Sequence, residues 1–216
     1  GGPVFVNNPY AAPASRRAFG WGAGIVIHST TIYRDGRAAA VGGAIVDSGK
    51  FDWEAHADKY PGLTTPDESY HGITYTKKFG LEGAYITKAT AQLMRDFGST
   101  PAPMNAWLLG MGMETLPLRM ARHCENGLAM ARHLQSHPKV AWVRYPSLPG
   151  DKYHDLAKKY LPRGASGVVS FGVKGGRAAA EPTDAGTPRR MEVFQIWRRI
   201  LKENDIFRIF RKIYNL

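Results

Sequence analysis

The segment from Gly24 to Gly43, GIVIHSTTIYRDGRAAAVGG, constrains the fold more than any other part of the chain. Its apolar start, Ile25–Ile27, is followed by three hydroxyl residues, Ser29–Thr31, and a second apolar run begins at Ala44. This order predicts a strand, a polar turn and a second strand. In an open α/β sheet, hydroxyl groups at the carboxyl end of a buried strand are well placed to bind an anion. Such hydroxyls often satisfy the backbone of their own turn instead, and the spacing alone favours that interpretation.

Several positions of this segment fit a known pattern, which runs His-Ser-x-Thr-Lys-Tyr-x-x-Gly-His and ends in a Gly-Gly strand start. The matching residues are His28, Ser29, Thr31, Tyr33, Gly36, Gly42 and Gly43. The segment therefore resembles the cofactor-lysine segment of the Cys/Met-metabolism family of pyridoxal-phosphate enzymes. The run from Val41 to Trp53 is similar to the O-acetylhomoserine sulfhydrylases of that family, and the stretch from Glu114 to Leu148 resembles the family most of all.

The resemblance breaks at the position that carries the chemistry. Ile32 stands in place of the lysine that forms the Schiff base, and Arg37 replaces a histidine. An alkyl side chain can neither bond to the cofactor nor move the α-proton of a substrate. The resemblance also implies that Ser29 and Thr31 hold the cofactor phosphate and that Asn7 faces the pyridine nitrogen, where the family has a negatively charged aspartate. We therefore expect pyridoxal phosphate as the cofactor, without covalent attachment.

The resemblance implies an α/β fold of the fold-type I pyridoxal-phosphate transferase kind, with a mostly parallel sheet and the beginning of an α+β small domain. Two consecutive strand–helix units with Gly-rich turns agree with a parallel sheet. We expect residues 1–113 to be the C-terminal part of the cofactor-binding large domain. Residues 114–181 are then the linking helix and the start of the small domain, and residues 182–216 are a basic amphipathic tail unlike the family.

Local patterns predict further elements. Apolar spacing indicates a helix over residues 84–96 that ends at Gly98, and a long helix after Glu114 with Arg119 on its solvent or subunit face. Three aromatic residues, Tyr70, His71 and Tyr75, are interpreted as part of a surface loop. The remaining predicted elements are strands at 3–6, 140–145 and 168–173 and a helix at 153–160.

The resemblance covers roughly five-sixths of the chain and corresponds to a middle segment of the family's architecture. The family's Gly-rich phosphate loop, the tyrosine that stacks on the cofactor and the arginine that binds the substrate carboxylate fall outside that segment. We therefore expect exposed apolar surface on the α/β core and impaired catalysis by this chain alone.

The formal charge of +11 raises nucleic acid or acidic lipid as partners. Residues 182–216 account for +4 of it, with eight Lys/Arg against four acidic residues, and the rest is spread without an aromatic-interleaved basic stripe. Neither nucleic acid nor a membrane is therefore expected as a partner of the core. The tail has the apolar spacing of a membrane-binding or helix-binding segment, and an unselected addition would look the same.

The single cysteine, Cys124, excludes an intramolecular disulfide and a cysteine-based metal cluster, and we expect it to be a half-buried structural thiol. The sequence has no apolar run of membrane-spanning length and no secretory leader pattern, so a cytoplasmic location is expected.

Three functions remain open from the sequence. The first is an O-acetylhomoserine sulfhydrylase-like transferase of transsulfuration and methionine biosynthesis, acting on an amino-acid substrate and impaired by Ile32. The second is a non-catalytic, truncated homologue that packs in a homo-oligomer or against a full-length paralogue. The third is a binding module that acts through the basic tail.

Overall fold

A computed structural model describes residues 1–37 and 39–176 of the chain. The described residues divide into two compact units, residues 1–125 with 155–167, and residues 126–154 with 168–176. The predicted tail, residues 182–216, lies outside the described residues.

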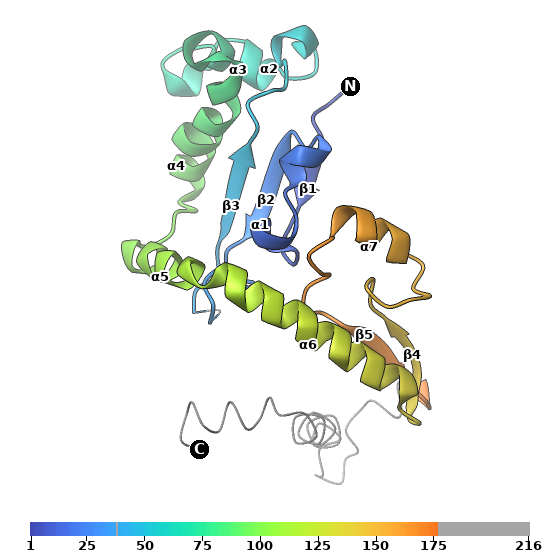
Figure 1. The fold of residues 1–216 in the computed structure, drawn as a ribbon. Coiled ribbons are helices and arrows are strands. Elements are labelled where there is room, and N and C mark those ends of the chain that lie inside the picture. The colour runs from blue at the N-terminus through green and yellow to red at the C-terminus, as the bar shows by residue number, and fades with distance from the viewer. Residues whose placement is uncertain (38, 177–216) are drawn as a thin grey trace. The chain divides into compact units, whose positions relative to one another are not determined.

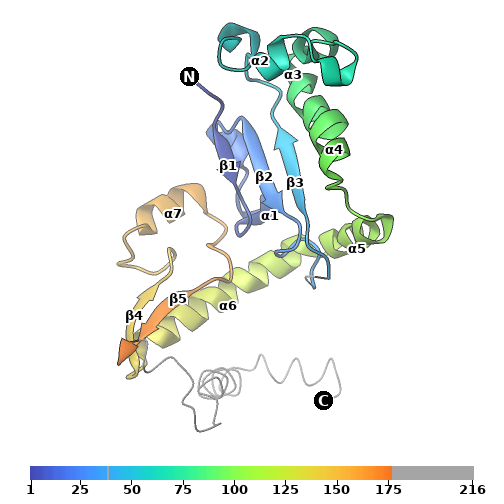
Figure 2. The ribbon, with the colours of Figure 1, turned by 180° about the vertical axis from the view of Figure 1, so that it is seen from behind.

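The first unit contains a three-stranded sheet in the order β1 (Phe5–Asn7), β2 (Ile25–Ser29), β3 (Gly43–Asp47), seen from its two sides in Figure 1 and Figure 2. β1 and β2 are parallel, because α1 (Ala12–Ser15) and the short helix η1 (Ala18–Trp21) lie on the crossover between them. β2 and β3 are antiparallel, because residues 30–42 form a turn that reverses the chain. The described part of the sheet therefore contains one parallel pair and one antiparallel pair.

The core of this unit forms around aromatic residues that follow β3. Trp53 and Tyr75 are 2% and 0% exposed, and they cluster with Ile25 of β2. The interpretation of Tyr75 as a surface-loop residue is therefore wrong, whereas His71 is exposed as expected. The short helices that carry this cluster are η2 (Glu54–His56), α2 (Pro61–Thr64) and η3 (Glu68–Tyr70).

A long helical segment follows the aromatic cluster. α3 (Tyr75–Lys88) is interrupted at Gly80, where φ is 70°, and continues through a π-helical stretch, η4 (Ala89–Met94), into α4 (Arg95–Phe97). The segment begins earlier than the predicted residue 84, but it ends as predicted at Gly98, whose φ of 68° closes the helix. Pro103 then opens α5 (Pro103–Glu114).

The second unit contains the C-terminal half of α6 (Leu116–Ser136) and an antiparallel pair, β4 (Val140–Arg144) and β5 (Ser170–Val173). Ala131 and Leu134 of α6 are buried. These strands and α7 (His154–Tyr160) confirm the elements predicted at 140–145, 168–173 and 153–160. The domain boundaries at residues 113 and 181 stay predictions.

Candidate functional site

The hydroxyl groups that follow β2 close the turn between β2 and β3. The Thr30 amide donates to the Gly42 carbonyl oxygen at 2.9 Å, and the Gly42 amide donates to Thr31 Oγ1 at 3.0 Å. The Ile32 amide donates to Ser29 Oγ at 3.2 Å. Both predicted phosphate ligands thus accept backbone hydrogen bonds, as the spacing alone favoured. Each hydroxyl still has its own O–H group with which to donate to an anion.

The predicted cofactor residues lie at one edge of the sheet. Asn7 ends β1 and pairs with Ile27, two residues before Ser29, and the carboxyl ends of parallel strands share an edge. Asn7 is exposed, while the neighbouring Asn8 is 3% exposed. The backbone N–H of Asn8 donates to the Ile27 carbonyl oxygen at 2.8 Å. The fold therefore gathers Asn7, Ser29 and Thr31 at this edge, and their roles toward a cofactor stay predictions.

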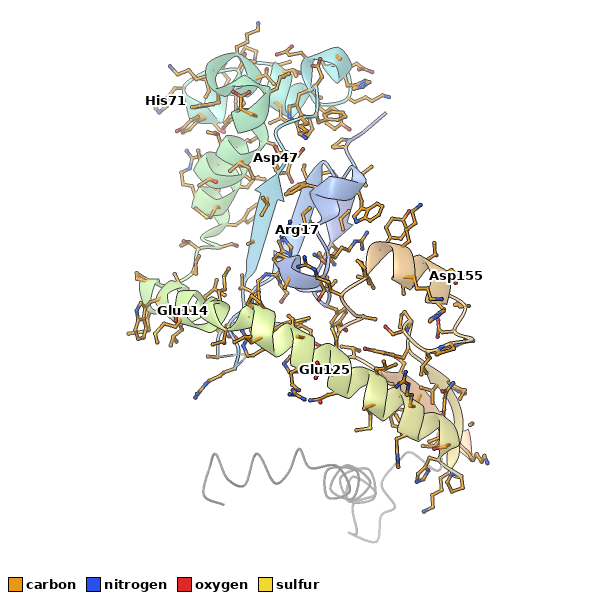
Figure 3. All side chains as sticks on the ribbon, in the orientation of Figure 1. Arg17, Asp47, His71, Glu114, Glu125 and Asp155 are labelled. Atoms are coloured by element: carbon orange, nitrogen blue, oxygen red, sulfur yellow. The ribbon has the colours of Figure 1, made fainter. Side chains whose placement is uncertain are left out.

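The turn fits pyridoxal phosphate in one respect and fails in another. Ser29 and Thr31 offer hydroxyl donors of the kind that bind phosphate, but the half-buried Ile32 side chain offers no amine. Lys50 is the first lysine of the sequence, and it lies beyond the far end of β3. Figure 3 labels Asp47 at that end. The pairing Ile25–Asp47 lies four residue steps along the strands from the pairing Ser29–Gly43, a distance of roughly 13 Å.

A buried guanidinium supports the turn from inside the fold. Arg34 is 3% exposed and donates to the Ser29 carbonyl oxygen at 2.6 Å and to His28 Nδ1. The same Nδ1 lies 3.3 Å from the Asn8 carbonyl oxygen, so this ring nitrogen faces both a donor, Arg34, and an acceptor. Burial lowers the pKa of His28, the positive charge of Arg34 lowers it further, and the contact with the Asn8 carbonyl oxygen opposes the shift.

Arg119 of α6 is the residue of this region that sequence reasoning placed wrongly. It is half-buried, and it donates to the carbonyl oxygens of Tyr33 and Gly112 instead of facing solvent. Burial lowers the pKa of Arg119, and the negative charge of Asp35 opposes that shift. The amphipathic pattern of α6 gave no signal for these contacts, because they join residues far apart in the sequence.

Other kinds of site find no support in the part of the chain that the structure describes. No group of three or more His, Cys, Asp or Glu side chains among residues 1–37 and 39–176 could hold a metal ion. Within the same ranges, no helix combines the length and apolar character that a membrane span requires. Cys124 is 8% exposed, so the thiol is more deeply buried than predicted.

Comparison of the sequence with known proteins identifies the family to which the chain belongs. The family model described as "Cys/Met metabolism PLP-dependent enzyme" matches residues 1–187. The chain is 44% identical to the homocysteine synthase of Schizosaccharomyces pombe over 82% of its own length and 41% of that protein. It is 47% identical to an O-acetyl-L-homoserine sulfhydrylase of Thermus thermophilus over 76% of its own length and 38% of that protein. The chain thus spans about two fifths of the length of these relatives.

A solved structure agrees with the sequence relatives. The chain superposes with a TM-score of 0.71 and 35% identity on an O-acetylhomoserine (thiol)-lyase from Campylobacter jejuni, which contains an N'-pyridoxyl-lysine-5'-monophosphate residue. The match covers 79% of this chain and 42% of that one, and it confirms the predicted fold class. With its strand–turn–strand motif, this fold and a family match over most of its length, the chain belongs to the Cys/Met metabolism family of pyridoxal-phosphate-dependent enzymes.

Proposed function

We propose that this chain is an O-acetylhomoserine sulfhydrylase-like homologue that binds pyridoxal phosphate without a covalent bond and is impaired in catalysis. The observation that carries the proposal is Ile32 at the position of the cofactor lysine. Bound pyridoxal phosphate supplies an electron sink for chemistry at the α-carbon of an amino acid. The side chain of Ile32 has no amine to attach that group and no basic atom to accept the α-proton.

The proposed ligands act on the two ends of the cofactor. The Ser29 and Thr31 hydroxyls donate to its phosphate, and the Arg34 guanidinium, 2.6 Å from the Ser29 carbonyl oxygen, adds positive charge behind the turn. The exposed Asn7 amide meets the pyridine ring without supplying a negative charge. The site thus favours an anionic, ring-bearing ligand while leaving the proton-transfer step without a base.

A non-catalytic role as a packing partner is the alternative, and the surface of α5 favours it. None of the residues of α5 is buried, although the helix is rich in apolar side chains. Met104, Trp107 and Met111 are 62%, 59% and 51% exposed. An apolar helix of this kind fits a second copy of the chain or a full-length paralogue.

A binding role of the basic tail is the third proposal, and a lipid or nucleic-acid pull-down of residues 182–216 at two salt concentrations tests it.

Two measurements on the purified chain test the first proposal. Titration with pyridoxal phosphate, followed by absorbance, should show saturable binding that Ser29→Ala and Thr31→Ala each weaken. Borohydride reduction and peptide mass spectrometry should then show no adduct concentrated at one lysine, because covalent attachment requires an amine in the site. Arg122→Ala serves as the matched control, since the Arg122 side chain is 63% exposed and pairs with Glu125 at 3.1 Å.

The decisive result concerns activity and attachment together. A pyridoxyl adduct at one specific lysine of the unmodified chain, combined with measurable conversion of O-acetylhomoserine and sulfide, would show that another residue replaces the missing lysine. Saturable binding without turnover supports the impaired-homologue proposal. Absence of any saturable binding favours the packing-partner alternative.

A further inference from the structure

Tyr33 follows the cofactor-lysine position and has an unusual backbone conformation. Its φ is 66°, in the left-handed region that residues with a side chain rarely adopt. Its ring lies against the His123 ring, with 5.0 Å between centroids, and its hydroxyl accepts a hydrogen bond from the Gly167 amide at 3.1 Å. Backbone strain of this kind persists only where surrounding contacts enforce it, and it concentrates at functional sites.

Arg119 supplies the contact that holds the backbone of this residue. One terminal nitrogen donates to the Tyr33 carbonyl oxygen, and the other lies 2.5 Å from the Gly112 carbonyl oxygen and 3.4 Å from that of Arg34. Nε donates to Thr115 Oγ1 at 2.9 Å. The planar guanidinium therefore joins two consecutive carbonyl groups of the turn to the end of α5.

Gly112 shows how closely α5 approaches the same turn. A Cβ atom built on Gly112 would overlap the carbonyl group of Asp35 and lie 2.7 Å from its Cα. Only glycine therefore lets the helix backbone lie directly against the turn backbone. The turn is held on one side by the surface of α5 and at its carbonyl groups by Arg119, so the residue just before Tyr33 cannot rotate independently.

We infer that Arg119 is a positioning residue for the cofactor turn, and that it fixes the direction in which residue 32 presents its side chain. It acts through the carbonyl groups of Tyr33 and Arg34 and does not itself contact a ligand. This inference rests on the proposed function, because that function assigns the turn to pyridoxal phosphate. Because Arg119 acts on the backbone, it fixes this direction for any side chain at position 32.

The test restores an amine at position 32 and then releases the turn. The full chain with Ile32→Lys is incubated with pyridoxal phosphate, reduced with borohydride and digested. The amount of pyridoxyl adduct at position 32 is then divided by the amount at Lys50 in the same digest. This ratio cancels differences in reagent and in total labelling. Addition of Arg119→Ala should lower this ratio at least tenfold, since loss of even one hydrogen bond to a charged group shifts an equilibrium by about that order.

Two further variants separate positioning from a general loss of structure. Arg119→Lys keeps the positive charge but can bind only part of the set of acceptors, so the ratio should recover in part. Arg122→Ala changes an exposed arginine of the same helix and should leave the ratio unchanged. An equal ratio with and without Arg119 would overturn the inference and leave the proposed function intact. A chain with Ile32→Lys that gains no adduct at position 32 would overturn the proposed cofactor site, and the inference with it.

Discussion

The contact between Gly112 and Asp35 predicts that two glycines of α5 respond in opposite ways to alanine. A Cβ atom at Gly110 has no heavy atom within 4 Å, so Gly110→Ala should stabilise the helix by about 1 kcal/mol through propensity alone. Gly112→Ala gains the same helix-propensity stabilisation, but it forces a methyl group into the Asp35 backbone. Overpacking costs about 1–3 kcal/mol, and we expect the upper end because backbone atoms cannot rotate away.

The expected net effect of Gly112→Ala is a loss of about 2 kcal/mol, and the two variants should therefore differ by about 3 kcal/mol. Urea denaturation followed by far-UV circular dichroism measures both. With an m-value of about 2 kcal/mol/M, the urea midpoint should fall by about 1 M for Gly112→Ala and rise by about 0.5 M for Gly110→Ala. Equal increases in the two midpoints would refute the close approach of α5 to the turn, and with it the geometry around Arg119.

Three other predictions follow from the same region. Burial and Arg34 lower the pKa of His28 in the fold. The contribution of neutral His28 to the free energy of unfolding should therefore be fully present above a pH of about 6.5 and be lost as the pH falls through the lowered folded pKa. His28→Asn should flatten this part of a plot of urea midpoint against pH. Ser29→Ala and Thr31→Ala should each weaken pyridoxal phosphate binding at least tenfold in an absorbance titration, since each removes a donor to a charged phosphate, and unchanged affinity would place the phosphate elsewhere. Trp107→Ser should reduce self-association in light scattering because 59% of this residue is exposed on α5, whereas a chain that is monomeric before the change would contradict packing of that helix against a second copy of the chain.

The sequence predicted those parts of the fold that depend on local order. Gly98 was expected to end a helix because glycine adopts positive φ readily, and its φ is 68°. The strand that starts after Gly24 was expected from its apolar run, and β2 spans Ile25–Ser29. The cofactor turn was found by resemblance, since its hydroxyl spacing alone suggests an ordinary turn.

The errors concern contacts between distant parts of the chain. Arg119 looks like a surface residue because α6 is amphipathic, yet its acceptors lie 85 and 86 residues earlier in the sequence. Tyr75 follows a polar stretch rich in turn residues, but the aromatic cluster around Trp53 buries it completely. The sequence made no prediction of the direction of β3, because the hydrogen bond between Thr30 and Gly42 that closes the turn is a property of the folded backbone.

The position of β1 in the sheet affects how the chain behaves in concentrated solution. Within the described residues, β1 pairs with β2 on one side and has no strand on the other. An open strand edge is a template on which a strand from another molecule can align, and Phe5, 51% exposed, adds an apolar side chain there. We therefore expect intermolecular sheet extension to compete with the native fold as concentration rises. A charged substitution such as Phe5→Lys should delay the appearance of thioflavin-positive aggregates.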